Sequence, residues 1–342
     1  MSRVAVIGHF GIGLDLANGQ TIKTKIITEE VENYCNEKAI LVDAHGGVKA
    51  IIPVIFGSIN SLLRCKNIIL MLTENGLKVS VPVLSFFNKF FHRRLHYVVV
   101  GGWLPQFLKK QLGLAKKLKS FHMIYVETNN MKMLLEEMGF KNIVVMPNCK
   151  RLEIVSVPER CVKPYKLCTF SRVMKEKGIE DAVNAVILAN NSLGEEAFQL
   201  DIYGQIDSKQ TDWFENLKET FPDYIKYCGL IKFDQSTKVL KQYFALLFPT
   251  YYEGEGFAGT AIDAFSAGVP VLASDWKYNS EVIKNGINGG LFEAHNVEEI
   301  KKHLIEMAIH PETWQKMRDR CIVDAHAYKP DNVLKTLFNE LY

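Results

Sequence analysis

The sequence lacks the cysteine pattern of disulfide-rich or metal-binding domains. Its seven cysteines are odd in number and scattered, and none forms a Cys-x-x-Cys pair or a Cys/His spacing that suits a metal. A long apolar run is missing too, because the stretch from Ile51 to Leu63 is broken by polar residues, proline and glycine and is shorter than the roughly 20 residues of a membrane span. We therefore expect reduced cysteines, a cytosolic protein and no helix that crosses a bilayer.

The sequence also has no strong charge imbalance, and its first residues do not have the pattern of a leader segment. The 342 residues carry a formal net charge of +3, with 48% hydrophobic and 23% charged residues, which argues against a disordered chain and a dedicated nucleic-acid binder. The first residues, MSRVAVIGHFG, enter a strand-like run without the basic segment, the apolar segment or the cleavage site of a signal peptide. We expect that the protein is not exported.

Short apolar runs alternate with segments of helical period, which is typical of α/β folds with parallel sheets. In the first half the runs are Val4–Gly8, Ala39–Ala44, Asn67–Leu72, Tyr97–Gly102, Met123–Glu127 and Ile143–Pro147. In the second half they are Leu167–Ser171, Leu200–Gly204, Tyr227–Leu230, Leu246–Pro249, Val269–Ser274 and Gly290–Phe292. The pattern predicts two doubly wound domains, because 342 residues exceed what one core usually serves.

The predicted domains cover residues 1–155 and 156–326, with the linker in a stretch of prolines and charges at 148–164. Residues 327–342 predict a helix, begun at Pro330, that crosses back towards the first domain. Open parallel sheets bind ligands at the carboxyl ends of their strands. We therefore expect the two domains to face each other across a cleft that holds the ligand.

A basic loop follows the first predicted strand of the second half. Arg172 and Lys177 lie between this strand and a helix with apolar positions at Ile179 and Val183. Side-chain cations beside a helix N-terminus make an anion site, and the pair suits a diphosphate. The alternative is an ordinary solvated loop.

The segment from Pro249 to Val271 carries the strongest local signal, a loop with three glycines that leads into a short helix. Glu255 lies in the loop and Asp263 follows eight residues later, so both carboxylates could reach the hydroxyls of one bound sugar or ribose. For Asp263 the alternative is a capping box with Thr260. Glu253 is interpreted as a surface acid.

These motifs resemble the retaining glycosyltransferases of family 4, which have the GT-B fold of two Rossmann-like domains. The Glu-x7-Glu motif of that family corresponds to Glu255 and Asp263, and Ala-x-x-x-Gly-x-Pro-Val corresponds to 264–271. Further matching segments are Arg172 with Glu176-Lys177-Gly178, Asp201-Ile202-Tyr203-Gly204, Tyr227-Cys228-Gly229, Ala273-Ser274-Asp275, Glu281-Val282-Ile283 and Gly286-Ile287-Asn288-Gly289. The resemblance covers the second half and is fainter in the first, at Asn18-Gly19 and 145–148.

The resemblance implies a role for each matching residue. Arg172 and Lys177 would bind the donor diphosphate and, with Glu255, act in catalysis, while Asp263 would hold the ribose. The remaining donor-binding positions would be Gly11, Gly13, Gly204, Gly256, Phe257, Ala258 and Gly259. Two departures stand out: Asp263 is one methylene shorter than the usual Glu, and Gly101-Gly102-Trp103 stands where many members have a His. We assign no catalytic His.

The implied activity is transfer of a hexose-type sugar, with retention, from a nucleotide-diphosphate sugar, with UDP favoured as the nucleotide. The resemblance assigns residues 1–155 to the acceptor and 156–326 to the donor. The acceptor would be a glycan or a lipid-linked sugar in the synthesis of a surface polysaccharide. We expect no cofactor and no metal, because the chain contains no Asp-x-Asp and its cations and amides can take the place of a metal.

Residues Phe86–His122 combine eight lysines and arginines with no acid and with several aromatic residues. The aromatic and large apolar side chains in this stretch are Phe86, Phe87, Phe90, Phe91, Trp103, Phe107 and Leu108. This composition favours contact with an anionic membrane, at the inner face of the cell membrane, over a solvated basic face. No nucleic-acid-binding motif accompanies the stretch, so we expect no nucleic-acid partner.

Three other functions are weighed against transfer. A glycoside hydrolase could use Glu255 and Asp263 as paired carboxylates, but it would have no need of Arg172 and Lys177. A dinucleotide-dependent dehydrogenase is disfavoured because residues 8–13 lack the Gly-x-Gly-x-x-Gly order. An inactive glycosyltransferase-like partner protein stays open, on the grounds of Asp263 and the missing His.

Overall fold

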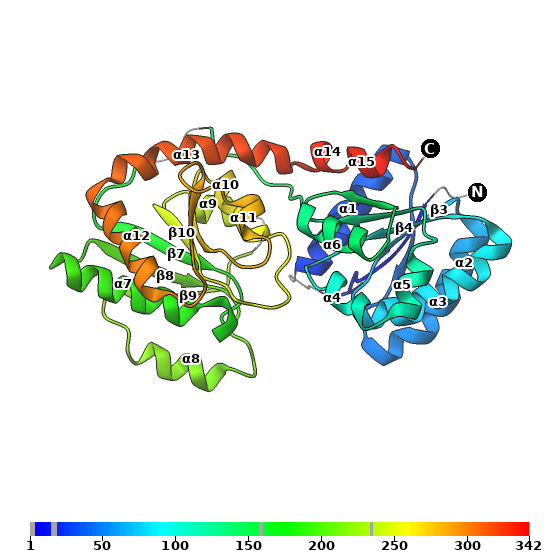
Figure 1. The fold of residues 1–342 in the computed structure, drawn as a ribbon, viewed down its shortest axis with the longest axis horizontal. Coiled ribbons are helices and arrows are strands. Elements are labelled where there is room, and N and C mark those ends of the chain that lie inside the picture. Colours follow the sequence, from blue (N-terminus) through cyan, green and yellow to red (C-terminus); the bar gives the residue numbers. More distant parts are fainter. Residues whose placement is uncertain (1–3, 15–18, 157–159, 233–234, 342) are drawn as a thin grey trace. The chain divides into compact units, whose positions relative to one another are not determined.

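The computed structural model describes residues 4–14, 19–156, 160–232 and 235–341. Two compact units are formed, one by Met1–Arg151 together with Pro330–Tyr342 and the other by Leu152–Lys329 (Figure 1). The division of the chain falls four residues before the predicted boundary at 155. The last residues pack with the first unit, as two short helices, α14 (Pro330–Val333) and α15 (Lys335–Phe338), in place of the single helix expected.

The first unit is a parallel sheet of six strands within the described residues, in the order β2-β1-β3-β4-β5-β6. Its strands are β1 (Val4–Gly8), β2 (Ile40–Asp43), β3 (Asn67–Met71), β4 (Arg94–Val98), β5 (Met123–Val126) and β6 (Ile143–Val145). Its helices are α1 (Gly19–Cys35), α2 (Ile51–Arg64), α3 (Glu74–Phe91), α4 (Leu104–Lys109), α5 (Leu112–Leu118) and α6 (Asn129–Glu137). Every residue of β1 and β3 is buried, as expected of strands covered on both faces.

Strand β4 begins three residues before the predicted run, because a buried histidine interrupts the apolar pattern. The ring of His96 lies between the side-chain oxygen of Asn67, 3.2 Å from Nε2, and the hydroxyl of Tyr125, 3.2 Å from Nδ1. Burial, with smaller effects of His122 and Arg94, lowers the pKa of His96 to about 3. A neutral imidazole with two polar neighbours can therefore occupy a core position that the sequence pattern assigns to an apolar residue.

One face of the first sheet is covered by α1 and the terminal segment. Leu334 and Leu337 are fully buried in the same core as Ile27 and Val31 of α1. The amide of Asn67 donates to the carbonyl of Leu341, at 3.0 Å. Apolar burial and this hydrogen bond explain why the end of the chain belongs to the first unit.

Helix α2 is continuous, although its apolar run was expected to be broken by polar residues, proline and glycine and to be too short for a membrane span. Pro53 lies in its first turn, where a missing N–H costs no intrahelical hydrogen bond. Among the described residues, the segment 47–64 is long and apolar enough to cross a membrane by composition, and 28% of it is buried. Val54, Ser58, Ser61 and Leu62 form its buried face, so α2 packs as a helix of the first unit.

The second unit is also a parallel sheet of six described strands, in the order β12-β11-β10-β7-β8-β9. Its strands are β7 (Tyr165–Phe170), β8 (Phe198–Tyr203), β9 (Ile225–Gly229), β10 (Ala245–Phe248), β11 (Val271–Ser274) and β12 (Gly289–Phe292). Its helices are α7 (Ile179–Leu193), α8 (Thr211–Lys218), α9 (Ser236–Leu240), α10 (Gly259–Ser266), α11 (Asn279–Val282), α12 (Val297–Ile309) and α13 (Pro311–Ala325). The predicted α/β class with two doubly wound sheets is confirmed.

Strand order reverses once in each sheet, between β1 and β3 in the first and between β7 and β10 in the second. Ligands of such sheets bind outside the carboxyl ends of the strands at this switch point. In the second unit the loops there, after β7 and β10, contain Lys177 and Glu255. In the first unit the loop after β1 contains Gly11 and Gly13. The topology therefore brings the predicted site residues of each unit to the place where a ligand is expected.

Candidate functional site

The second unit brings Lys177 and Glu255 into direct contact although they are 78 residues apart in the chain. The ammonium nitrogen of Lys177 lies 2.5 Å from Oε2 of Glu255, and the side chains are 13% and 11% exposed. The same ammonium lies 4.9 Å from the ring centroid of Tyr252, near enough for a cation–π contact. One of its three N–H donors serves Glu255.

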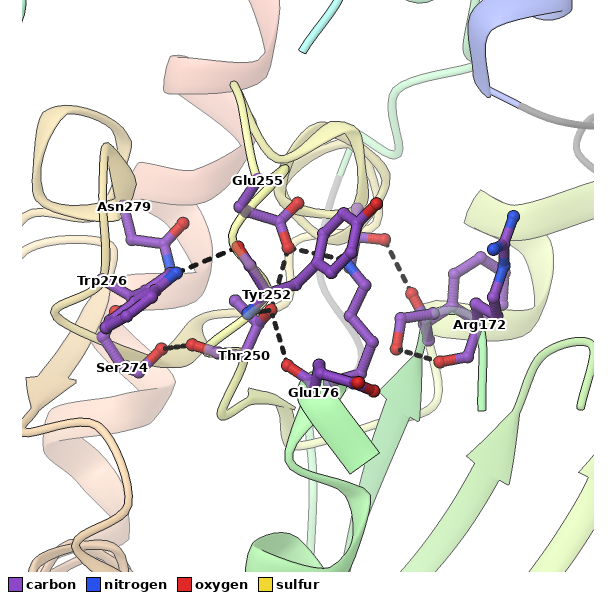
Figure 2. A network of polar contacts seen from close by, with 12 residues as sticks. Arg172, Glu176, Thr250, Tyr252, Glu255, Ser274, Trp276 and Asn279 are labelled. Carbon is purple, nitrogen blue, oxygen red and sulfur yellow. Dashed lines mark hydrogen bonds and ion pairs between the residues drawn. The ribbon is translucent and has the colours of Figure 1, made fainter. Parts of the chain in front are cut away.

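A network of hydrogen bonds holds the loop after β10 around this ion pair (Figure 2). The hydroxyl of Thr250 donates to Glu255 Oε2 at 2.9 Å, and the hydroxyl of Ser274 donates to the carbonyl of Thr250. The indole N–H of Trp276 donates to the carbonyl of Tyr252 at 3.0 Å. Thr250, two residues after β10, therefore orients the carboxylate of Glu255, while Ser274 at the end of β11 and Trp276 beyond it hold the backbone of the loop.

The loops after β7 and β10 approach each other at Gly178. This residue has φ +68°, and a Cβ there would lie 2.0 Å from the carbonyl oxygen of Pro249. The N–H of Tyr251 donates to the carbonyl of Glu176, at 2.8 Å. A glycine after Lys177 is thus required for the contact that brings Lys177 to Glu255.

Gly204, predicted to bind the donor, has a structural reason to be glycine. Its φ is +140°, and a Cβ would lie 1.7 Å from the carbonyl oxygen of Ser171. Its N–H donates to the carbonyl of Gly229 and its carbonyl accepts from the hydroxyl of Tyr227. These contacts place the end of β8 tightly against the loop that contains Arg172, and a donor contact stays a prediction.

Arg172 lies on the same loop as Lys177 but makes a separate ion pair. Its Nη1 lies 3.5 Å from Oδ2 of Asp207, and its side chain is 56% exposed. An exposed pair at this distance is weak. The guanidinium is therefore available to an anion at the cost of one weak contact.

Asp263 lies in the second turn of α10, and the predicted capping box with Thr260 is wrong. The N-cap of α10 is Ala258, and the hydroxyl of Thr260 donates instead to the carbonyl of Phe170, at 2.6 Å. Asp263 is 2% exposed, and its Oδ1 accepts from the hydroxyl of Ser236, at 2.8 Å. The structure thus holds this carboxylate from α9, and its contact with a ribose stays a prediction.

Four further predicted donor-binding positions, 256–259, lie immediately before α10 and at its first residue. Gly256, Phe257 and Ala258 are buried immediately before the helix, which begins at Gly259. No side chain caps this helix, so its first N–H groups lack an acceptor from a cap. Such a helix start is suited to bind an anion, as the sequence predicted for these amides.

In the first unit, Asp43 holds the loop that contains Gly11 and Gly13. Its Oδ1 accepts from the N–H groups of Phe10 and His45, and its Oδ2 accepts from the N–H of Ile12, at 2.9–3.0 Å. Burial by itself would raise the pKa of Asp43, but these bonds and one from Gly11 lower it below the usual value. Asp43 was not predicted as a site residue, although it lies near the end of the predicted strand Ala39–Ala44.

Two histidines adjoin this loop. Nε2 of His9 lies 2.8 Å from Nδ1 of His45, and Nδ1 of His9 lies 2.9 Å from the hydroxyl of Thr21. Burial, followed by the charge of His45, lowers the pKa of His9. The switch point of the first unit therefore presents a neutral imidazole at neutral pH, from residues that had no assigned role in the sequence.

Two further expectations concern acids and metals. Glu253 is 68% exposed and pairs with Lys277 at 2.6 Å, as expected for a surface acid. Across the described part of the chain, no group of three or more His, Cys, Asp and Glu side chains is arranged to hold a metal. Independence of metal nevertheless stays a prediction.

Comparison with known proteins shows to which family the chain belongs. Residues 150–325, slightly more than half of the chain, match the family described as glycosyl transferases group 1. The chain belongs to this family. Its two parallel-sheet units match the GT-B fold.

Individual relatives and solved structures extend the comparison. It is 22% identical over 259 residues to an uncharacterized glycosyltransferase, MJ1069, of Methanocaldococcus jannaschii, covering 74% of this chain and 62% of the relative. It is 36% identical over 146 residues to the UDP-N-acetylglucosamine--peptide N-acetylglucosaminyltransferase GtfA subunit of Streptococcus pneumoniae, covering 41% of this chain and 27% of the relative. The chain thus spans less than two thirds of the length of these relatives.

One solved structure matches this chain over its full given length. Sucrose-phosphate synthase from Thermosynechococcus elongatus superimposes with a TM-score of 0.79 over 100% of this chain and 99% of the other, at 14% identity. At this identity the match shows the fold alone. Membership of a transferase family disfavours the glycoside hydrolase and the dehydrogenase.

Proposed function

We propose that this glycosyltransferase is a retaining, metal-independent member of family 4. It moves a hexose-type sugar from a UDP-sugar to a glycan or lipid-linked acceptor in the synthesis of a surface polysaccharide, in the cytoplasm at the inner face of the cell membrane. The observation that carries the proposal is the contact of Lys177 with Glu255 at the switch point of the second sheet. The streptococcal relative, whose name includes a UDP-sugar, supports the choice of nucleotide.

In the proposed reaction, the bond between the anomeric carbon of the donor sugar and the diphosphate breaks. The oxygen of the acceptor hydroxyl then forms its bond on the same face of the sugar, and the proton of that hydroxyl passes to the departing diphosphate. Negative charge develops on the departing diphosphate, where the ammonium of Lys177 and the guanidinium of Arg172 stabilise it. Both remaining N–H donors of Lys177 point to the diphosphate in this proposal, while Glu255 keeps the ammonium in place and accepts from a sugar hydroxyl.

The first turn of α10 supplies the second part of the proposed donor site. Uncapped N–H groups and the helix dipole favour an anion there, so the amides of 256–259 hold the β-phosphate. Because cations and amides neutralise the diphosphate, no divalent metal is needed. Addition of EDTA should then leave turnover unchanged, and activity that returns only with Mg²⁺ or Mn²⁺ would show that the proposal is wrong on this point.

Thermal-shift measurements with UDP, GDP, TDP and their sugars test the proposed donor. A nucleotide at 100 times its dissociation constant should stabilise the protein by about 2.7 kcal/mol. We expect the largest shift with UDP and its sugars, followed by release of UDP when a UDP-hexose is incubated with the protein. A thermal shift with GDP alone would mean that the proposed nucleotide is wrong, while the proposed enzyme class would stand.

The second candidate is a catalytically inactive partner protein that stabilises an active homologue. The observation that favours it is the burial of Asp263 against Ser236, where the family motif has a longer acid. An inactive partner should release no nucleotide from any sugar donor, even where the thermal shift shows that nucleotide binds. Release of nucleotide from a single donor would eliminate this candidate.

A further inference from the structure

The first unit exposes an apolar surface on α2, on the turn before it and on the end of α3. Val48 (83% exposed) lies on the turn before α2, Ile52 (65%), Phe56 (69%) and Leu63 (51%) lie on α2, and Phe86 (58%) and Phe90 (71%) lie on α3. We call these six residues the α2–α3 surface. The two helices pack against each other, and Figure 1 shows them side by side, so five of the six side chains lie on adjacent helices.

This surface overlaps only in part with the stretch Phe86–His122 that the sequence predicted. Of the seven large apolar residues named in 86–122, two are exposed, whereas Phe107 and Leu108 are buried and the other three are half-buried. The indole N–H of Trp103 donates to the carbonyl of Val100. The apolar part of the predicted patch is thus mostly core of the first unit, and α2 supplies most of the exposed apolar side chains.

Positive charge is concentrated around the α2–α3 surface. Residues 44–126 contain 12 of the 41 lysines and arginines of the chain and only 1 of its 38 acids, Glu74. Glu74 lies in the first turn of α3, at the opposite end of the helix from Phe86 and Phe90. The whole chain has a net charge of only +3, so the rest of the molecule is acidic on balance.

The topology of the sheet gathers these cations at one edge. Helices that connect parallel strands run antiparallel to them, so the C-terminal ends of α2, α3 and α5 meet at the edge where the strands begin. The exposed cations Arg64, Lys66, Lys89, Lys116 and Lys117 lie at or beside these helix ends. Nε of Arg93 donates to the carbonyl of Leu62, which joins the end of α3 to the end of α2. Leu63 and Phe90 lie at the same ends.

We propose that the α2–α3 surface docks this glycosyltransferase on an anionic lipid bilayer. The six apolar side chains enter the interface between headgroups and acyl chains, and the cations at the helix ends contact the lipid phosphates. A second copy of the chain is a poor occupant, because a symmetric contact through this surface would bring two cationic edges together. An anionic bilayer matches both the apolar and the charged part of the surface.

Vesicle co-sedimentation tests the docking without any sugar donor, so its outcome is independent of the proposed reaction. The probes are phosphatidylcholine vesicles with and without about one third phosphatidylglycerol. We expect binding to the anionic vesicles only, with loss of binding at about 0.5 M NaCl. Ile52→Ser/Phe56→Ser should weaken binding at least about tenfold, and so should Phe86→Ser/Phe90→Ser, a second pair on the other helix.

The matched control is Ile309→Ser/Val323→Ser, which removes two apolar side chains of similar exposure (59% and 60%) from the second unit. It should bind vesicles as the unchanged protein does. The proposal is overturned if the protein ignores anionic vesicles, or if both serine pairs on α2 and α3 bind undiminished. It is also overturned if light scattering shows a dimer that these pairs convert to a monomer while vesicle binding is absent.

Discussion

The two switch points of the molecule occupy equivalent places in their sheets but differ in chemistry. After β7 and β10, the second unit places a half-buried ion pair, Lys177 with Glu255, beside an uncapped helix. After β1, the first unit places backbone amides held by Asp43 and a pair of imidazoles, His9 with His45. A common topology thus fixes where a ligand is expected, while the side chains decide which charges it meets.

The difference in packing at the two switch points can be tested with two Gly→Ala variants. Gly178→Ala should lower the free energy of unfolding by about 3 kcal/mol or more, because its Cβ would meet the carbonyl of Pro249 at 2.0 Å. Gly13→Ala should cost about 1 kcal/mol, because φ is +82° there but nothing lies within 4 Å of the new Cβ. Urea denaturation measures both, and equal losses would mean that the two loops are equally constrained.

Acid should destabilise the first unit through His96. Its folded pKa of about 3 lies below the value of about 6.5 in the unfolded chain, so its stabilising contribution is complete above pH 6.5 and declines as the pH falls towards 3. At pH 4.5 the loss should be roughly 2–3 kcal/mol. His96→Gln should flatten this pH dependence in urea denaturation, and an unchanged slope would assign the acid sensitivity to other groups.

The charge at the second switch point can be tested by kinetics. Lys177→Ala should reduce kcat about tenfold or more, since it removes a cation aimed at the leaving group. It should also destabilise the second unit, because Glu255 is left half-buried without its partner. Lys277→Ala is the matched control, since Lys277 pairs with the exposed Glu253 in the neighbouring loop and should turn over normally.

The smallest effect is expected at Asp43. Asp43→Asn should cost about 1 kcal/mol, because an amide cannot accept from N–H groups at both of its ends. The carboxylate of Asp43 stabilises the fold above its unfolded pKa of about 4, and this contribution is lost as the pH falls through the lower folded value. Thermal melts at pH 3 and pH 7 should therefore differ less in the variant, and an equal difference would show that Asp43 does not titrate with the fold.

The two α/β sheets and the position of the glycine-rich loop after β10 could be predicted from the sequence alone. Buried parallel strands are continuous apolar runs, and the loop from Pro249 is marked by closely spaced glycines. Both are patterns of residues that are neighbours in the chain, so they can be recognised in the sequence. The start of β4 and the end of the chain were harder to predict. His96 can be buried only because Asn67 and Tyr125 are its polar neighbours. The terminal helices pack only where the core of the first unit receives them.

Which charged side chains pair with each other depends on the tertiary structure. Lys177 pairs with Glu255 because Gly178 lets two distant loops touch, whereas Arg172 pairs with Asp207 and Asp263 is held by Ser236. The exposure of the apolar face of α2 could not be predicted from the sequence either. An apolar helix has the same sequence whether the rest of the unit covers all of its surface or only one side. Contacts between residues far apart in the chain depend on packing, and periodicity along the chain carries no information about them.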